Sequence, residues 1–154
     1  MKKEEELKTY DRVIDFAIER EAEAEIFYRN LAGKVHDSAV QSILQEFAEE
    51  EALHKEKLER LKSGQKAVLS GRPAPRFRSP LDIAEPHPGP GMTLADALAL
   101  AIKKEKAAYR LYLDLAVDAP TQELMDLFLT LAREEANHKV RFEIEYDDLS
   151  VTSG

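Results

Sequence analysis

The second half of this chain repeats the first half, and the two copies align without a gap. Residues 17–32 align with 101–116, and residues 48–55 align with 132–139 at the same offset. Each copy contains two stretches in which apolar residues recur at three- and four-residue steps, the period of an amphipathic helix. We therefore predict that the chain is two copies of one helical hairpin, which makes its fold class all-α.

The first hairpin is predicted over about residues 7–62. Its first helix is followed by Gly33, which fits the C′ position of a helix end. Its second helix begins near Ser38, a residue that can form a capping box with Gln41. The loop between the two helices is short, so we expect them to be antiparallel neighbours.

The second hairpin is predicted over about residues 93–147. Thr93 and Asp96 resemble a capping pair at the start of its first helix. Pro120 fits the beginning of its second helix, because proline is tolerated in the first turn. The apolar pattern of this hairpin continues to about Ile144.

The segment between the hairpins, residues 63–92, contains four of the six glycines and six of the seven prolines. It cannot form a continuous helix. Two short loops with one long crossover between helices two and three are the connectivity of a ferritin-like four-helix bundle. A plain bundle with a flexible linker fits the same topology. We predict a single ferritin-like domain over residues 1–154.

Composition limits the function. The formal net charge of −8 opposes binding to nucleic acid or to an anionic membrane surface. There is no cysteine, so thiolate metal sites, iron–sulfur clusters and thiol catalysis are excluded, and any metal must be held by Glu, Asp and His. No signal-peptide pattern or membrane-spanning apolar stretch is recognisable. We expect a cytoplasmic protein.

Two glutamates lie on helix faces that are otherwise apolar. Glu21 is seven residues from both Ile14 and Tyr28, and seven residues are close to two helical turns. Glu105 occupies the matching position in the second copy. Both carboxylates are therefore predicted to point into the core.

The second helix of each copy contains the motif Glu-x-x-His, as Glu51 with His54 and Glu135 with His138. Apolar residues flank these positions at seven-residue spacing, so both members of each pair should face the core. A single motif of this kind is weak evidence, because a core-facing histidine is more often a packing residue than a ligand. Two motifs, each matched to an inward glutamate at equal spacing, are specific.

Four carboxylates and two imidazoles in an apolar interior are costly unless positive charge lies among them. Two divalent ions supply +4 against −4. One Glu from each of two helices and Glu-x-x-His from each of the other two is the ligand set of di-iron and di-manganese carboxylate bundles. The predicted ligands are Glu21, Glu51, His54, Glu105, Glu135 and His138.

Other candidate ligands are weaker. His36 falls in a loop and His87 in the crossover, and neither has a glutamate three residues before it, so both are predicted non-ligands. Glu49, Glu50 and Glu134 adjoin ligand positions but are turned away by about 100° or more around the helix. They are expected to be solvated or to support the ligands indirectly.

Tyr28 and Tyr112 are seven residues after the two inward glutamates. They fit ordinary core aromatics whose hydroxyl groups need a partner. They also fit hydrogen-bond donors to ligand carboxylates, and we favour this second interpretation, which makes them candidate catalytic residues.

These motifs resemble the rubrerythrin family of the ferritin-like superfamily over essentially the whole chain. The rubrerythrin-like pattern of Glu with Ala at three and Tyr at seven residues further on is met by Glu21, Ala24 and Tyr28. The two Glu-x-x-His motifs are met as well. The resemblance implies a di-iron protein of the ferritin-like fold.

The resemblance also implies a role for each ligand. Glu51 and Glu135 would bridge the two metal ions. Glu21 and Glu105 would be terminal ligands, and each metal would have one histidine. The implied cofactor is two iron ions, although manganese and zinc accept many of the same ligands.

The sequence departs from the family in two respects. It lacks the four cysteines of the rubredoxin module that many rubrerythrins carry, so we expect electrons to come from a separate donor. Ala108 stands where rubrerythrins tend to have an additional glutamate, which makes the ligand set look more like that of bacterioferritin. Against bacterioferritin, Ala52 replaces its heme-ligating methionine, and no fifth helix is predicted.

Three functions fit these features. The first is reduction of hydrogen peroxide, or of dioxygen, by a di-iron centre that an external donor reduces again. The second is a ferroxidase or iron-handling protein that oxidises Fe(II) for storage. The third is a structural bundle that keeps its metals for stability. We also expect a homodimer, because a long crossover allows helix pairs to exchange between chains.

Overall fold

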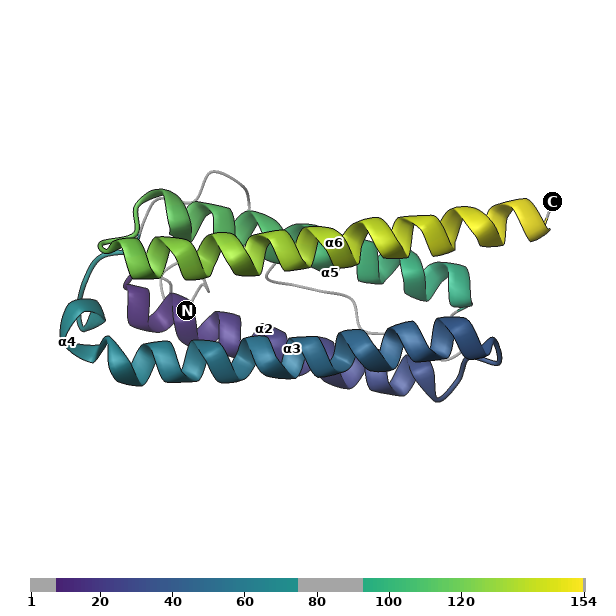
Figure 1. The fold of residues 1–154 in the computed structure, drawn as a ribbon, viewed down its shortest axis with the longest axis horizontal. Coiled ribbons are helices and arrows are strands. Elements are labelled where there is room, and N and C mark those ends of the chain that lie inside the picture. The colour runs from purple at the N-terminus through teal and green to yellow at the C-terminus, as the bar shows by residue number, and fades with distance from the viewer. Residues whose placement is uncertain (1–7, 75–92, 154) are drawn as a thin grey trace. The chain divides into compact units, whose positions relative to one another are not determined.

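The computed structural model describes residues 8–74 and 93–153, and in this part of the chain the only regular elements are helices (Figure 1). None of the described helices is both long and apolar enough to cross a membrane. The predicted all-α class is confirmed. The elements are α2 (Tyr10–Ala32), α3 (Ser38–Gly64), α4 (Lys66–Leu69), α5 (Leu94–Val117) and α6 (Gln122–Ser153).

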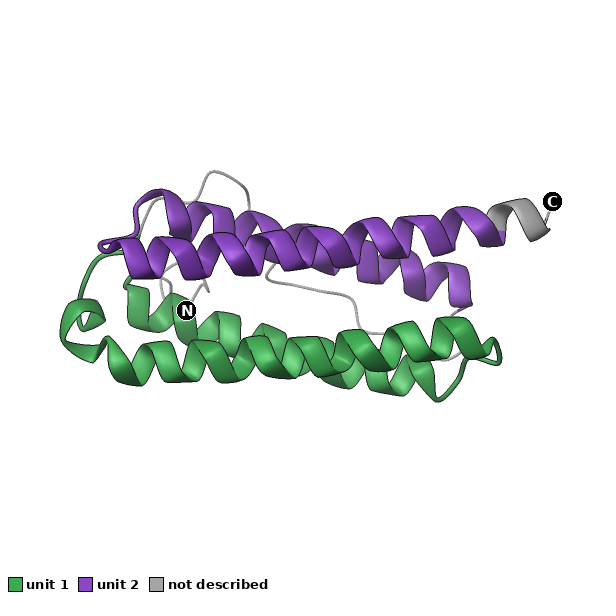
Figure 2. Cartoon of the chain, viewed as in Figure 1, with its two compact units in different colours: residues 1–76 green, residues 77–154 purple. Residues whose placement is uncertain are grey.

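The chain divides into two compact units, residues 1–76 and 77–154 (Figure 2). The first unit contains the antiparallel pair α2 and α3, here called the first hairpin, followed by the short α4. The second unit contains the antiparallel pair α5 and α6, the second hairpin. This helix order is that of a ferritin-like bundle, as predicted.

The predicted crossover is partly helical. α3 extends to Gly64, two residues past the predicted end of the first hairpin at about residue 62, and α4 adds one further turn inside residues 63–92. Residues 75–92, with most of the prolines, lie outside the described part of the chain.

The loop between α2 and α3 differs from the prediction. The N-cap of α3 is Asp37, whose carboxylate accepts two backbone N–H groups of the first turn, at 2.9 and 3.1 Å. Ser38 is already helical, and the Gln41 side chain donates to the carbonyl of Ala32, so the predicted Ser38–Gln41 capping box is wrong. Gly33 has a φ of −69°, so it does not adopt the left-handed conformation of a C′ glycine.

The start of α5 is the one predicted. Thr93 and Asp96 form a capping box in which each side chain accepts the backbone N–H of the other residue. At the start of α6 the first helical residue is Gln122, two positions after Pro120. The hydroxyl of Thr121 accepts the backbone N–H three residues further on, at 3.2 Å, and takes the capping role.

In the first unit, backbone hydrogen bonds join residues 8–10 to residues 72–74. The N–H of Tyr10 donates to the carbonyl of Arg72 at 2.9 Å, and the N–H of Ala74 donates to the carbonyl of Lys8 at 2.7 Å. These bonds flank an isolated antiparallel bridge. The chain reaches this position after Gly71, whose φ of +71° is a conformation that favours glycine.

Each hairpin is held together by large apolar and aromatic side chains on its inner faces. Full burial of one such side chain stabilises a fold by about 1.5–3 kcal/mol. The largest fully buried side chains are Tyr10, Ile14, Tyr28, Leu44, Leu58 and Leu69 in the first unit and Leu98, Tyr112, Leu115, Leu124, Phe128 and Phe142 in the second.

Candidate metal centre

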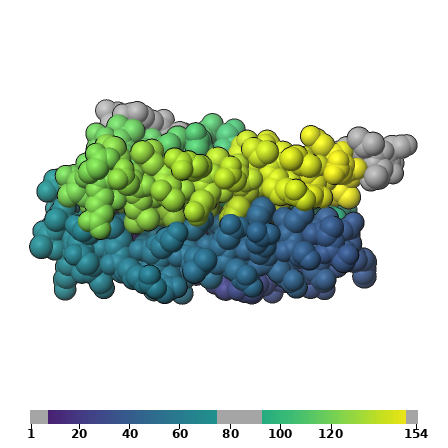
Figure 3. All heavy atoms as spheres, in the orientation of Figure 1, coloured from purple at the N-terminus to yellow at the C-terminus, as the bar shows by residue number. Residues whose placement is uncertain are grey.

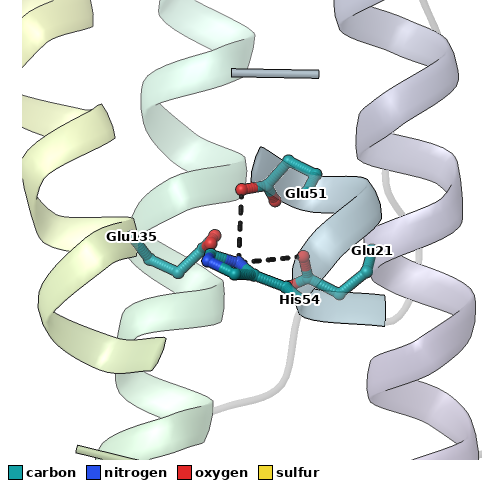
Figure 4. Close-up of side chains that lie close together, drawn as sticks. All are labelled: Glu21, Glu51, His54 and Glu135. Atoms are coloured by element: carbon teal, nitrogen blue, oxygen red, sulfur yellow. Dashed lines mark ion pairs between the residues drawn. The ribbon is translucent and has the colours of Figure 1, made fainter. Parts of the chain in front are cut away.

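In the first hairpin three potential metal ligands meet between the two helices. Glu21 comes from α2, and Glu51 and His54 come from adjacent turns of α3. His54 Nδ1 lies 3.3 Å from Glu21 Oε2 and 3.5 Å from Glu51 Oε1, as the dashed lines in Figure 4 mark. One ligand atom of each residue lies within 4.8 Å of those of the other two.

The apolar rows around these residues explain why they point inward. Glu21 lies between the buried side chains of Ile14 and Tyr28 on α2, as the seven-residue spacing predicted. On α3, Glu51 lies between buried Leu44 and Leu58 in the same way. Because each glutamate lies on the same helix face as these apolar residues, the face that packs into the core also buries the carboxylate.

The second hairpin contains the same arrangement. Glu105 of α5 meets Glu135 and His138 of α6, again with ligand atoms within 4.8 Å of one another. His138 Nδ1 lies 3.6 Å from Glu105 Oε2. The internal repeat is thus a repeat of the arrangement of these three side chains as well as of sequence.

The charge and the distances fit a metal. All six residues are 2% exposed or less, so each hairpin buries two carboxylates and one imidazole away from water. Two ligand atoms that each lie about 2.1 Å from one ion are separated by roughly 3.0 to 3.4 Å. The histidine–carboxylate distances of 3.3, 3.5 and 3.6 Å are close to that range. Glutamate and histidine are donors that iron, manganese and zinc accept.

Tyr28 and Tyr112 are both fully buried, each in the hairpin of its matching glutamate. The ring of Tyr28 packs against that of Phe27, with centroids 5.5 Å apart and planes tilted by 50°. A buried phenol needs a partner for its hydroxyl group. That the ligand carboxylates provide it stays a prediction.

The described residues that the sequence analysis rejected as ligands lie at or near the surface. His36 and Glu49 are exposed, and Glu50 and Glu134 are half-buried. Exposed Glu49 agrees with the expected solvated position, and for half-buried Glu50 and Glu134 both expected roles, solvated or indirectly supporting, stay open. His87 lies outside the described residues.

One buried carboxylate was not identified from the sequence. Asp114 is buried near the end of α5, although the corresponding residue of the first hairpin, Asn30, is exposed. The repeat therefore gave no signal for it. Its spacing of three residues from buried Leu111 was the available clue.

Comparison with known proteins gives one family and one related structure. Residues 96–153 match the Rubrerythrin family. The crystal structure of a conserved hypothetical protein, rv2844, from Mycobacterium tuberculosis is similar, with a TM-score of 0.60 and 16% identity, and the match covers 85% of this chain and 95% of that one. At this identity the likeness concerns the fold. No curated protein matches significantly.

The family match covers the second hairpin, including Glu105, Glu135, His138 and Tyr112. The first hairpin, where the same three ligand types occur at the matching positions of the repeat, lies outside the matched segment. The resemblance to the rubrerythrins, a family of the ferritin-like superfamily, is thus confirmed on residues 96–153 of this chain.

Proposed function

We propose that this chain binds two iron ions and reduces hydrogen peroxide with electrons from an external donor. One observation carries the proposal: each hairpin buries a complete set of one glutamate and one Glu-x-x-His pair, with ligand atoms within 4.8 Å of one another. Such duplicated sets are the ligands of dinuclear carboxylate bundles. The Rubrerythrin match over the second hairpin supports the same centre.

In this proposal the six side chains would hold the two ions in the roles that the family resemblance implies. Glu51 and Glu135 would be the bridging ligands, Glu21 and Glu105 would be terminal, and His54 and His138 would supply one histidine to each ion. Bound iron supplies one electron per ion, which together make the two electrons needed to convert hydrogen peroxide and two protons into two water molecules.

The remaining roles belong to the protein. Carboxylates are hard donors that can change between bridging and chelating modes, so the ligand set tolerates both Fe(II) and Fe(III). Tyr28 and Tyr112 orient ligand carboxylates through their hydroxyl groups. These 154 residues contain no cysteine that could hold a redox centre, so in this proposal the electrons come from a donor outside them.

Oxidation of Fe(II) for storage is the second candidate. The observation that favours it is Ala108, a half-buried small residue three positions after Glu105, which leaves a six-residue ligand set without a further carboxylate. In that case Fe(II) is the substrate, and iron would accumulate beyond two ions per chain.

The ligand assignment is tested by counting metals on purified variants after anaerobic loading. Glu51→Ala and Glu135→Ala should each lose both metals, because each removes a bridging ligand. His36→Ala and His87→Ala are the controls and should keep both. Full occupancy in Glu51→Ala would show that the bridging assignment is wrong.

The reaction is tested by stopped-flow oxidation of the reduced di-iron protein. Hydrogen peroxide should oxidise it faster than dioxygen does, and sustained turnover should require an added reductant. A clear preference for dioxygen, with ferric iron accumulating as a mineral, would move the assignment to ferroxidase. Metal binding without oxidation by either would leave a structural role for the ions.

A further inference from the structure

The outer face of α6 carries apolar side chains along several turns. We call Leu129, Ala136, Val140 and Ile144 the α6 stripe; they lie within an arc of about 80° on the helix. Leu129, Val140 and Ile144 are 40%, 52% and 47% exposed, and Ala136 is half-buried. Figure 3 shows the surface of α6 in green to yellow. The buried ligands Glu135 and His138 lie on the opposite side of the helix.

The corresponding face of α3 is polar. The residues at the matching positions of the first copy are Gln45, Ala52, Glu56 and Arg60. Glu56 and Arg60 are exposed and form an ion pair with each other, as expected for a face in contact with water. A hairpin of this kind therefore forms without an apolar outer face on its second helix, so the fold of the hairpin does not explain the α6 stripe.

Two charges lie on the same face as the stripe, at equal distances from its centre. Arg133 is seven residues before Val140, and Asp147 is seven residues after it. Both are exposed, and neither forms a salt bridge within the described part of the chain. By contrast, Lys139 and Arg141 each pair with a glutamate four residues further on.

We propose that this face of α6 is an interface with a second copy of the chain, in which two α6 helices pack antiparallel about a two-fold axis at Val140. In this register Arg133 faces Asp147 of the partner subunit, and the symmetry repeats the pair on the other side. Ala136 faces Ile144 of the partner subunit, and Val140 faces its own copy. The apolar contacts form the centre of the interface, with charge pairs at its two ends.

The charge pattern selects this arrangement over the alternatives. Parallel packing would place Arg133 opposite its own copy. An antiparallel register centred between Ala136 and Asn137 would place exposed Asp126 opposite Asp147 of the partner subunit. Like charges directly opposite each other oppose association. Of these three arrangements, the register centred on Val140 is the one that pairs opposite charges, and it also brings the apolar side chains of Ala136, Val140 and Ile144 together.

Sedimentation velocity of the metal-loaded full chain at increasing concentration tests the interface. The wild type should form a dimer whose population rises with concentration. Arg133→Asp and Asp147→Arg should each weaken the dimer by roughly tenfold or more, because each places like charges at both ends. The double variant Arg133→Asp with Asp147→Arg should restore it, and Arg110→Asp, at an exposed position on α5, should behave as wild type.

A wild type that stays monomeric, or single variants that dimerise like the wild type, would overturn the proposal. Cross-linking tests the register independently, because the chain contains no cysteine. Val140→Cys should form an intermolecular disulfide, since the two-fold axis brings the two side chains together. Leu53→Cys on α3 is the matched control at 53% exposure. Equal cross-linking of the two variants would contradict the Val140 axis.

Discussion

The two hairpins agree in their interiors and differ on their surfaces. Glu21, Glu51 and His54 correspond to buried residues of the second copy, and in each copy the histidine Nδ1 lies 3.3 or 3.6 Å from the glutamate of the preceding helix. On the outside, the ion pair of Glu56 and Arg60 corresponds to exposed apolar residues on α6. A substitution at a buried position disturbs the packing around it, whereas a solvent-facing position can change without disturbing the core.

The N-caps of α3 and α6 are intermediate between the retained interior and the changed surface. Both hairpins have a side-chain cap at this position, but the capping residue differs. Asp37 and Thr121 occupy matching positions of the repeat, and each caps the second helix of its hairpin. Each side-chain oxygen accepts the backbone N–H three residues further on. What is repeated at this position is an oxygen acceptor, which either residue type supplies.

Removing the metals should give the largest effect, because it acts on the feature that the hairpins share. Without metal, each hairpin buries two carboxylates with no divalent cation to offset their charge. A ligand at a thousand times its Kd contributes about 4 kcal/mol per site, so we expect the melting temperature to fall by roughly 10 °C or more. Calorimetry of chelated and reloaded protein at neutral pH measures it. Equal melting temperatures would contradict a role for metal in folding.

Matched core substitutions should give the next largest effect. Leu44 and Phe128 are fully buried residues at corresponding positions, seven residues before Glu51 and Glu135. Leu44→Ala should cost about 2–5 kcal/mol and Phe128→Ala about 3–5 kcal/mol in the free energy of unfolding. Urea denaturation followed by circular dichroism gives both values.

The same experiment tests whether the chain is one domain. If the hairpins unfold together, each substitution shifts one common transition. Two transitions, of which only one moves in each variant, would show that the hairpins unfold separately and would contradict the single-domain prediction.

The caps should give the smallest effect. Asp37→Ala should cost about 1 kcal/mol, and Thr121→Ala a similar amount or less, since the Asp37 carboxylate also interacts favourably with the helix N-terminus. Ser38→Ala is the control and should change stability little, because Ser38 is exposed and is not the cap. A Ser38→Ala cost equal to that of Asp37→Ala would reverse the cap assignment. The change in the free energy of unfolding of all three variants is measured from their chemical denaturation midpoints, with one common dependence on denaturant concentration.

The helices that carry the candidate ligands could be predicted because the same spacing of glutamate, histidine and apolar residues occurs in both copies of the repeat. Glu21 and Glu105 each follow a row of apolar residues, so their burial was expected from spacing alone. The cap of α3 was misplaced by one residue, because Asp37 and Ser38 are both good capping residues and only the backbone geometry decides between them. Asp114 was missed because its burial is not shared with its counterpart. The assignment of bridging and terminal ligands came from the family resemblance and stays a prediction.

The backbone pairing between residues 8–10 and 72–74 gives the first unit a topology suited to circular permutation. Because residues 8 and 74 lie next to each other, a short linker between them would close the described part of this unit into a ring. New termini opened at exposed Lys34, between α2 and α3, would leave both ligand-bearing helices uninterrupted. A chain in which α3 precedes α2 should therefore keep the same arrangement of Glu21, Glu51 and His54.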